Sequence, residues 1–445
     1  MKDLLKIVGN NAYTSHCNDN KPVDLSPERV YNGSTFIGIY RPSSAQSYAN
    51  FFSMSHALSN DDNFKRTEYA KVDRKNEIYG GAKYMAKLYS EVYKSAKYKL
   101  LGNGPRNFGN LMEAFENVDP STGSDFYGTG SIINGFEDEL AALLGKEKAV
   151  FFPSGTMAQQ IALRIWSDKA GIQKVAYHPL CHLEIHERDG LKKLHNLEPI
   201  LLGDKDRLFT IEDLMKVKQP ISCLLIELPQ REIGGQLPSF EELLKISDYC
   251  KANGIKLHLD GARLFEVLPY YNKTASEICS LFDSVYVSFY KGLGGIAGAI
   301  LAGEASLVDE AKVWKRRHGG DLISLYPYII SSKYSMDKRM GKMKEYWQYS
   351  LDTAAKFNKI PGIKTQPEVP VCNMFHIYFQ ASKDTVEKIL SKVTEKTDVA
   401  LVSYLNEIDA NCCMSELSFG DNYSLIPQKV IDEAISELQA EFKNL

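Results

Sequence analysis

Short apolar runs alternate with segments of helical periodicity along the chain from Phe136 onward. The first helical pattern, FEDELAALL, ends at Gly145 and is followed by the apolar run AVFF, the turn PSGT and a second helical pattern. A strand, a glycine-containing turn and a helix in this order form a βα unit. Similar apolar runs recur at residues 174–177, 198–202 and 221–228. Because these runs are continuous rather than alternating, they predict strands covered on both faces of a parallel or mixed central sheet.

Helix signals continue the pattern toward the C-terminus. In SFEELLKISDYCKANG, Ser239 and Glu242 match a capping box, and Gly254 ends the predicted helix. Further strands are expected at residues 255–260, 283–289 and 297–303. Past about Asp321 the chain changes to a long helical stretch at 328–357, a strand at 373–379 and helices at 384–393 and 429–442. This change predicts a large α/β domain at 101–325 and a smaller α+β domain at 326–445.

Residues 1–100 differ from the rest of the chain. They are rich in Ser, Asn, Tyr and charged residues, and they contain one plausible helix at about residues 83–97. No chemistry can be assigned to them from the sequence. We therefore treat residues 1–100 as an N-terminal extension of unknown role.

Composition and charge narrow the class of partner. The chain has 445 residues and a formal net charge of -3, so it has no global basic surface for nucleic acid or for an anionic membrane. Its eight cysteines form no CxxC pair, which favours reduced thiols. The stretch MKDLLKIVGNNAYT has too short an apolar run for the secretory signal that an extracellular protein would need, and no segment approaches roughly 20 apolar residues. We expect a cytoplasmic protein with a small-molecule partner.

Two candidate catalytic residues lie where predicted strands end. Asp260, in KLHLDGARLF, ends a predicted strand, where burial of its carboxylate requires a compensating partner. Lys291 lies 31 residues later, between the strand at 283–289 and the glycines of GLGG. Open α/β sheets bind their ligands at the carboxyl ends of their strands, so both side chains are expected in one crevice.

A third strand end carries a candidate phosphate site. Ser154, Gly155 and Thr156 open a predicted helix, where backbone N–H groups, two hydroxyls and the helix dipole favour an anion. A phosphate site, a lysine able to form a Schiff base and a carboxylate able to hold a ring nitrogen protonated are what pyridoxal phosphate requires. Taken singly, each motif is more often an N-cap, a surface lysine or a turn. Their order on successive strand ends favours the cofactor.

Four motifs in this order resemble one family: YGTGSIINGFEDELAALLGKEKAVFFPSGTMAQQIAL, HLDGARLF, SFYKGLGGIAGAILAG and WKRRHGG. They look like the threonine aldolase branch of the β-eliminating lyases, which are fold-type-I pyridoxal-phosphate enzymes. The resemblance covers residues 101–320 well and the C-terminal part loosely. It implies a large domain with a mostly parallel central sheet, and a homodimer or homotetramer with active sites at the dimer interface.

The resemblance also implies roles for individual residues. Lys291 would carry the cofactor, Asp260 would contact the pyridine nitrogen, and His182 in CHLEIHE would stack on the ring. Arg263 would lie near the ring hydroxyl and the substrate carboxylate. Further contacts are implied for Ser154, Gly155, Thr156 and Ser288 at the phosphate, and for Tyr127, which would reach the site from a neighbouring subunit.

A metal site is the alternative interpretation of the histidines in and around CHLEIHE. His178, His182 and His186 are spaced four residues apart with Cys181 nearby, which could suggest zinc. A helix that begins before Pro179 is unfavourable, so the three need not share a face. We therefore expect no metal and structural roles for His178 and His186.

Several positions depart from the family pattern. Tyr290 and Ile296 stand where a serine and a proline are usual, and residues 102–107, GNGPRN, align with a stretch of the Arg-Ser-Asp-Thr type. An arginine expected near Ile323 is replaced, and the late carboxylate-binding arginine has no match in SELSFGDNYSLIP. Cofactor chemistry is thus better preserved than substrate recognition, and the exact substrate stays open.

The expected activity is cleavage of a β-hydroxy-α-amino acid to glycine and an aldehyde, with His182 as the base for the β-hydroxyl. Because the cofactor does not choose among bonds, β-elimination, decarboxylation or racemisation is the nearest alternative. A non-catalytic binding protein is a further alternative, although Lys291 and Asp260 count against it. A nicotinamide dehydrogenase is disfavoured because no GxGxxG follows a first strand.

Overall fold

The structure is a computed structural model that describes residues 3–8, 11–16 and 88–445. It divides into two compact units, Met1–Lys83 and Tyr84–Leu445. In the first unit, β1 (Asp3–Val8) pairs antiparallel with β2 (Asn11–His16). All residues for which the sequence suggested chemistry lie in the second unit.

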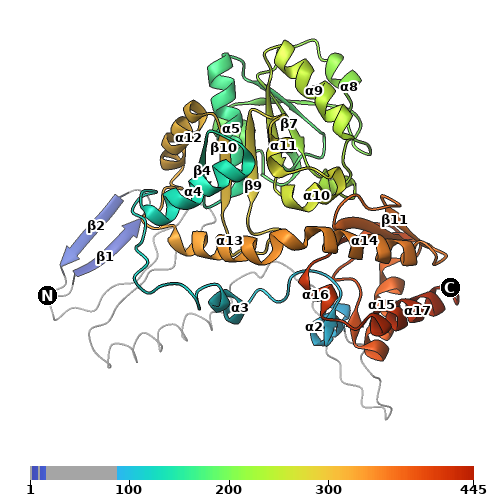
Figure 1. Ribbon diagram of the computed structural model, residues 1–445. Coiled ribbons are helices and arrows are strands. Elements are labelled where there is room, and N and C mark those ends of the chain that lie inside the picture. Colours follow the sequence, from blue (N-terminus) through green and yellow to red (C-terminus); the bar gives the residue numbers. More distant parts are fainter. Residues whose placement is uncertain (1–2, 9–10, 17–87) are drawn as a thin grey trace. The chain divides into compact units, whose positions relative to one another are not determined.

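A seven-stranded sheet forms the centre of the second unit (Figure 1). Its strand order is β4-β10-β9-β8-β7-β5-β6. The strands are β4 (Lys148–Phe152), β5 (Lys174–Tyr177), β6 (Glu198–Leu201), β7 (Cys223–Glu227), β8 (Lys256–Gly261), β9 (Ser284–Ser288) and β10 (Ala299–Gly303). Only β10 is antiparallel to its neighbours, and the other pairings in this sheet are parallel. The predicted mostly parallel central sheet is confirmed.

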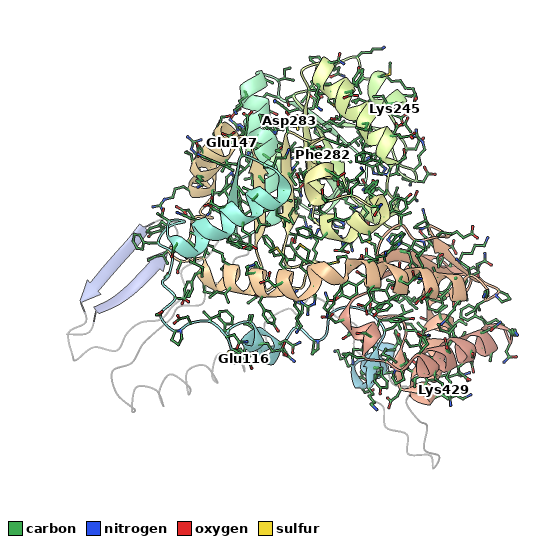
Figure 2. The ribbon with its side chains drawn as sticks, in the orientation of Figure 1. Glu116, Glu147, Lys245, Phe282, Asp283 and Lys429 are labelled. Atoms are coloured by element: carbon green, nitrogen blue, oxygen red, sulfur yellow. The ribbon has the colours of Figure 1, made fainter. Side chains whose placement is uncertain are left out.

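Both faces of this sheet are covered, which explains the continuous apolar runs. Neighbouring residues of one strand enter opposite cores, as Phe151 and Phe152 do in β4. The core around Phe151 includes α4 (Ser131–Leu144), α8 (Ile211–Met215), α9 (Phe240–Ala252), α10 (Leu264–Tyr271) and α11 (Ala275–Cys279). The core around Phe152 includes α5 (Gly155–Ala170), α6 (His182–Ile185), α7 (Gly190–His195) and α12 (Ala305–Arg317). Side chains fill the space between the helices and the strands (Figure 2).

The C-terminal part has its own sheet and core, as the sequence predicted. Its antiparallel strand order is β11-β12-β15-β14, with β11 (Ile363–Gln366), β12 (Met374–Phe379), β14 (Asn406–Asp409) and β15 (Cys412–Ser418). α15 (Lys383–Thr397) and α17 (Gln428–Phe442) pack on it. The long helical stretch comprises α13 (Tyr326–Arg339), the 3-10 turn η2 (Met340–Lys342) and α14 (Met343–Phe357), and it runs from below the large sheet toward the C-terminal elements (Figure 1).

The segment before the large sheet packs against the C-terminal part. Tyr89 in α2 (Tyr89–Ser95) and Leu100 both belong to the C-terminal core. β3 (Tyr98–Lys99) pairs in parallel with β13 (Val399–Ala400). The helix predicted at 83–97 is therefore present as α2, and residues 83–87 lie outside the described residues. The remaining short elements are α3 (Phe108–Glu113), η1 (Arg231–Ile233) and α16 (Asp421–Ser424).

The capping box predicted at the start of α9 is only half formed. Ser239 Oγ accepts the backbone N–H of Glu242 at 3.1 Å. The Glu242 carboxylate instead accepts the backbone N–H of Ile211 at 2.7 Å, at the start of α8. A tertiary contact has thus replaced the local one.

Within the described residues, no helix has the length and apolar character needed to cross a membrane.

Candidate active site

The residues of the predicted crevice meet at one edge of the large sheet. Asp260 is the penultimate residue of β8, and Lys291 follows the end of β9. Both line one narrow cavity, together with His182 and Arg263. We call this space, which also borders Glu227 and Arg231, the narrow cavity. Four of the predicted site residues are therefore brought together from three separate stretches of the chain.

The amine of Lys291 lies in an unusual electrostatic environment. Burial lowers the pKa of Lys291, and the neighbouring Arg263 guanidinium lowers it further, although Asp260 and Glu227 oppose this shift. A lowered pKa increases the fraction of neutral amine, which is the nucleophilic form of a lysine.

Asp260 is held by its own backbone. It is 3% exposed, and its Oδ1 accepts the backbone N–H of Ala262 at 3.0 Å. The next strand places a second carboxyl beside it, because Glu227 is the register partner of Asp260 in the parallel pair β7–β8. Burial raises the pKa of Glu227, and the adjacent Asp260 charge raises it further. Two carboxyl groups thus share this part of the narrow cavity.

His182 is oriented by acidic neighbours on both its ring and its backbone. Its Nδ1 lies 3.0 Å from Oε1 of Glu187, and its backbone N–H donates to Glu227 Oε1 at 3.2 Å. Glu187 is itself fixed, since its Oε2 accepts from Gln160 at 2.7 Å. A carboxylate at Nδ1 favours the tautomer that leaves Nε2 free to accept a proton.

The other two histidines of this region have different partners. His178 bonds to backbone at both ring nitrogens, through the Arg207 carbonyl and the N–H of Leu180. His186 Nε2 pairs with Glu232 Oε1 at 2.9 Å on the wall of the narrow cavity. Among the described residues, no group of three or more side chains is arranged to hold a metal ion.

The predicted phosphate residues lie on the same sheet edge but outside the wall of the narrow cavity. Ser154 is the N-cap residue of α5 and makes no side-chain capping bond. Ser288, at the end of β9, is paired through β10 with the end of β4 that leads into Ser154. Its Oγ is buried and has no hydrogen-bond partner among the residues that the structure describes. Gly155 packs against the Tyr286 hydroxyl so closely that a Cβ would clash.

Tyr127 is not brought to this cavity within the chain. It has a left-handed φ of 46° and is 40% exposed. The Arg316 guanidinium lies 4.4 Å from the centre of its ring. Its backbone N–H donates to the Ile323 carbonyl at 3.1 Å. The tyrosine therefore lies where two exposed loops meet and not beside Lys291.

Several charged residues of the site were not predicted. Glu227 carried a usable signal, since it ends an apolar run just as Asp260 does. Arg231 in η1 and Glu266 in α10 had no distinctive pattern around them. Burial raises the pKa of Glu266 to about 7, against the opposing effect of Arg263. Glu416 comes from β15 in the C-terminal part, so no local pattern could link it to the site.

A second and wider cavity has a volume of about 1000 Å³. Lys291 and Arg263 line it together with the segment 102–108 and residues of α13. Side chains that line this cavity donate hydrogen bonds to the backbone of residues 290–296, which we call the lysine loop. Asn103 Nδ2 donates to the Gly292 carbonyl at 2.7 Å, and Arg106 donates to the carbonyls of Tyr290 and Ile296.

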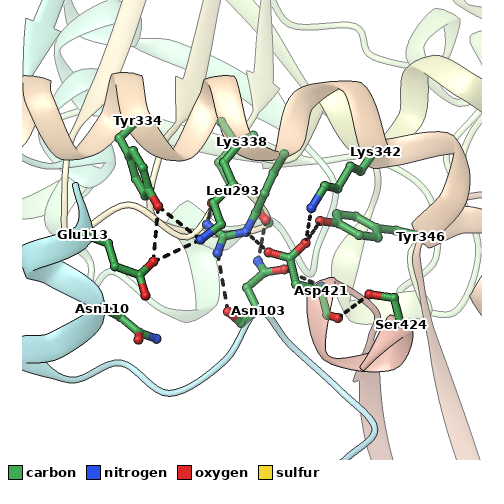
Figure 3. Close-up of polar contacts among 12 residues, drawn as sticks. Asn103, Asn110, Glu113, Leu293, Tyr334, Lys338, Lys342, Tyr346, Asp421 and Ser424 are labelled. Carbon is green, nitrogen blue, oxygen red and sulfur yellow. Dashed lines mark hydrogen bonds and ion pairs between the residues drawn. The ribbon is translucent and has the colours of Figure 1, made fainter. Parts of the chain in front are cut away.

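Arg339 links the lysine loop to the C-terminal part. It donates to the Leu293 carbonyl at 2.7 Å and, through Nε, to Asp421 Oδ2 at 2.8 Å. Asp421 also accepts from Lys342 at 2.9 Å, and Figure 3 shows this network around Asn103, Leu293 and Asp421. The segment GNGPRN, noted in the sequence for its departure from the family pattern, thus borders the site.

Comparisons with known proteins point to one family. The β-eliminating lyase family matches residues 110–380. A Listeria monocytogenes EGD-E structure, named as a candidate L-allo-threonine aldolase, is 57% identical and covers 79% of this chain and 98% of its own, with a TM-score of 0.79.

Two further relatives extend the match. An Exiguobacterium sp. 255-15 structure, named as a candidate aromatic amino acid β-eliminating lyase/threonine aldolase, is 53% identical and covers 79% and 99% of the two chains, with a TM-score of 0.78. Low-specificity L-threonine aldolase 1 of Arabidopsis thaliana is 26% identical over 60% of this chain and 77% of its own. The chain belongs to the β-eliminating lyase family.

Proposed function

We propose that this protein is a pyridoxal-phosphate-dependent lyase that cleaves the Cα–Cβ bond of a β-hydroxy-α-amino acid, releasing glycine and an aldehyde. The observation that carries this proposal is the convergence of Lys291, Asp260, His182 and Arg263 on one narrow cavity. The threonine aldolase names of the relatives support the choice of reaction.

The described residues fit the cofactor. Ser288 Oγ is a buried hydroxyl without a hydrogen-bond partner in the described part of the chain, and it lies close to the helix start at Gly155, where a Cβ has no room. Such a hydroxyl beside a helix N-terminus suits a phosphate. Asp260 is a buried carboxylate on the cavity wall, which suits a protonated ring nitrogen. Bound there, pyridoxal phosphate would supply the electron-withdrawing ring that stabilises negative charge on the substrate α-carbon.

The residues at the cofactor have separate tasks in this proposal. Lys291 holds the cofactor through its amine, whose lowered pKa favours the reactive neutral form. Asp260 would hold the proton on the ring nitrogen. Ser154, Gly155, Thr156 and Ser288 bind the phosphate through backbone N–H groups and hydroxyls. We call these residues the cofactor end of the site.

The residues at the substrate are His182 and Arg263. Arg263 has a buried Nε without a hydrogen-bond partner among the described residues, and it binds the substrate carboxylate. His182, on the wall of the narrow cavity, would accept the β-hydroxyl proton of the substrate at Nε2. The carboxylate of Glu187 at Nδ1 stabilises the imidazolium that this transfer creates. Arg263, with Arg231 and Glu416, forms what we call the substrate end.

We extend the proposal to a homo-oligomer, a dimer or tetramer, in which Tyr127 completes a neighbouring site. Phe126, Tyr127 and Ile323 are 65%, 40% and 61% exposed, which suits an interface. Mixing two inactive variants, Tyr127→Ala and Lys291→Ala, should restore part of the activity if sites are shared. A cytoplasmic location is also proposed, because the seven described cysteines are all free thiols.

The direct test is the spectrum of the purified protein with pyridoxal phosphate, before and after borohydride reduction, with the labelled peptide mapped. We expect a band near the visible edge and a label on Lys291. Lys291→Ala should lose both, whereas the exposed Lys429→Ala should keep both. A label on another lysine would overturn the assignment of the cofactor site.

The reaction itself is tested by assaying glycine after incubation with L-threonine, L-allo-threonine and β-phenylserine. Glycine from at least one substrate supports the aldolase proposal. No glycine from any of them overturns it. Pyruvate and ammonia from serine in its place would identify a β-eliminating lyase on the same residues.

A further inference from the structure

A carboxylate from the C-terminal part sits at the substrate end of the site. Glu416 on β15 lies with Oε2 2.7 Å from Arg231 Nε and with Oε1 3.7 Å from an Arg263 terminal nitrogen. His376 on β12 approaches it at 3.9 Å. The Glu416 side chain is 14% exposed, so its charge is largely removed from solvent. Arg231 and Arg263 are the two arginines on the wall of the narrow cavity.

Glu416 remains ionised in this position. Burial alone would raise its pKa, but His376, Arg263 and Arg231 together lower the pKa of Glu416 to about 2. Because the arginines hold the anion, Glu416 is a fixed negative charge beside the place proposed for the substrate carboxylate. Fixed charges in a partly desolvated site discriminate strongly between ligands of different charge.

The two arginines are not equally available to a ligand. Arg231 is held closely from two sides, by Glu416 at 2.7 Å and by Glu232 at 2.8 Å. Arg263 is held loosely, at 3.7 Å from Glu416 and 3.9 Å from Glu266. Those distances exceed a hydrogen bond. The site therefore offers one guanidinium to an incoming carboxylate, while the other is neutralised by the protein.

We propose that Glu416 is a specificity-determining residue that restricts the substrate to amino acids with a single carboxylate. A β-hydroxy-α-amino acid with a second carboxylate on its side chain would bring that anion toward Glu416 and Glu232, and it would find Arg231 already paired. Neutral side chains meet no such repulsion. This inference rests on the proposed function, since it assigns the substrate carboxylate to Arg263.

The test compares neutral and acidic amino acids in the protein loaded with pyridoxal phosphate. Binding of L-alanine and of L-aspartate is followed by the change in cofactor absorbance, and glycine release is measured from L-threonine and from 3-hydroxyaspartate. In the natural sequence we expect alanine to bind at least about tenfold more tightly than aspartate. Glycine release should show the same preference for threonine.

Glu416→Gln keeps the shape of the side chain and removes its charge. Two ratios are compared: alanine affinity over aspartate affinity, and glycine release from threonine over that from 3-hydroxyaspartate. We expect this variant to shift both ratios toward the acidic ligand by about tenfold or more, because Arg231 then becomes available. The matched control is Glu407→Gln, an exposed position on the neighbouring strand β14. It should leave both ratios unchanged.

The outcomes separate this inference from the proposed function. Equal binding of alanine and aspartate by the natural sequence overturns the inference alone, and this comparison needs no variant. Unchanged ratios in Glu416→Gln, with the spectrum still responding to alanine, also overturn it alone. A loaded protein whose spectrum responds to neither amino acid overturns the proposed function and this inference together.

Discussion

The cofactor end and the substrate end of the site are built from different kinds of sequence. At the cofactor end, Asp260, Lys291 and the Ser154–Thr156 turn each lie at or just after the end of a strand of one sheet, within short motifs that can be read locally. At the substrate end, Arg231 comes from a 3-10 turn and Glu416 from a strand of the C-terminal sheet. In the proposed function, fixed strand ends would hold a rigid cofactor, whereas the substrate would be recognised by residues that only the tertiary structure brings together.

The largest effect is expected from removing the charge at the cofactor end. Asp260→Asn should lower kcat/KM for glycine release by about 100- to 1000-fold, because a preorganised charge in a buried site has no substitute. The measurement is steady-state kinetics together with the pH dependence of the cofactor spectrum. Glu227→Gln, which changes the register partner of Asp260, is the control. An equal loss in both variants would mean that Asp260 is not the specific partner of the ring nitrogen.

A substitution at the substrate end should change the affinity for substrate and leave the binding of the cofactor unchanged. Arg263→Lys keeps the charge and loses the forked geometry that suits a carboxylate. We expect KM to rise by roughly 10- to 100-fold with the cofactor band unchanged. The readout is KM measured beside the spectrum of the loaded protein. A weakened cofactor band with unchanged KM would place Arg263 at the cofactor end instead.

The same contrast explains how far the sequence could predict the molecule. The strands and helices of the large sheet were predictable because continuous apolar runs, a glycine end signal and strand-end motifs are local. The prediction of a full capping box at Ser239 was wrong, because the Glu242 carboxylate accepts the backbone N–H of Ile211 in another helix. Glu227 could have been found by asking which other strands end in an acid. Glu416 could not, because it reaches Arg231 from a sheet about 185 residues later in the chain.

A smaller effect is expected where the two parts of the chain meet. Arg339→Lys can retain the ion pair with Asp421 but cannot at the same time donate from a second nitrogen to the Leu293 carbonyl in the lysine loop. Losing one such hydrogen bond should lower kcat by roughly three- to tenfold with cofactor content unchanged. The matched control is Lys342→Ala, which removes a contact to Asp421 but none to the loop. Equal losses in both variants would show that the Asp421 network acts through stability alone.

The smallest effect concerns stability and tests Glu266 beside Arg263. Burial raises the pKa of Glu266 in the folded protein to about 7, from a reference value of 4.5. Its stabilising contribution is therefore complete below about pH 4.5 and is lost as the pH rises through about 7. Between these values, the Tm of the cofactor-free protein should fall more steeply with pH than the Tm of Glu266→Gln, by about 2–4 °C over the window.

Glu277→Gln provides a control of opposite sign. The backbone N–H of Thr274, the Lys273 amine and the Thr274 hydroxyl lower the pKa of Glu277 to about 2, so its contribution is lost only when the pH falls below 4.5. Its Tm curve should run parallel to that of the natural sequence between pH 4.5 and 7. If the Glu266→Gln curve is parallel as well, Glu266 is ionised throughout. Arg263 would then already be paired at neutral pH, and the substrate end would lose the loosely held guanidinium that distinguishes it from the cofactor end.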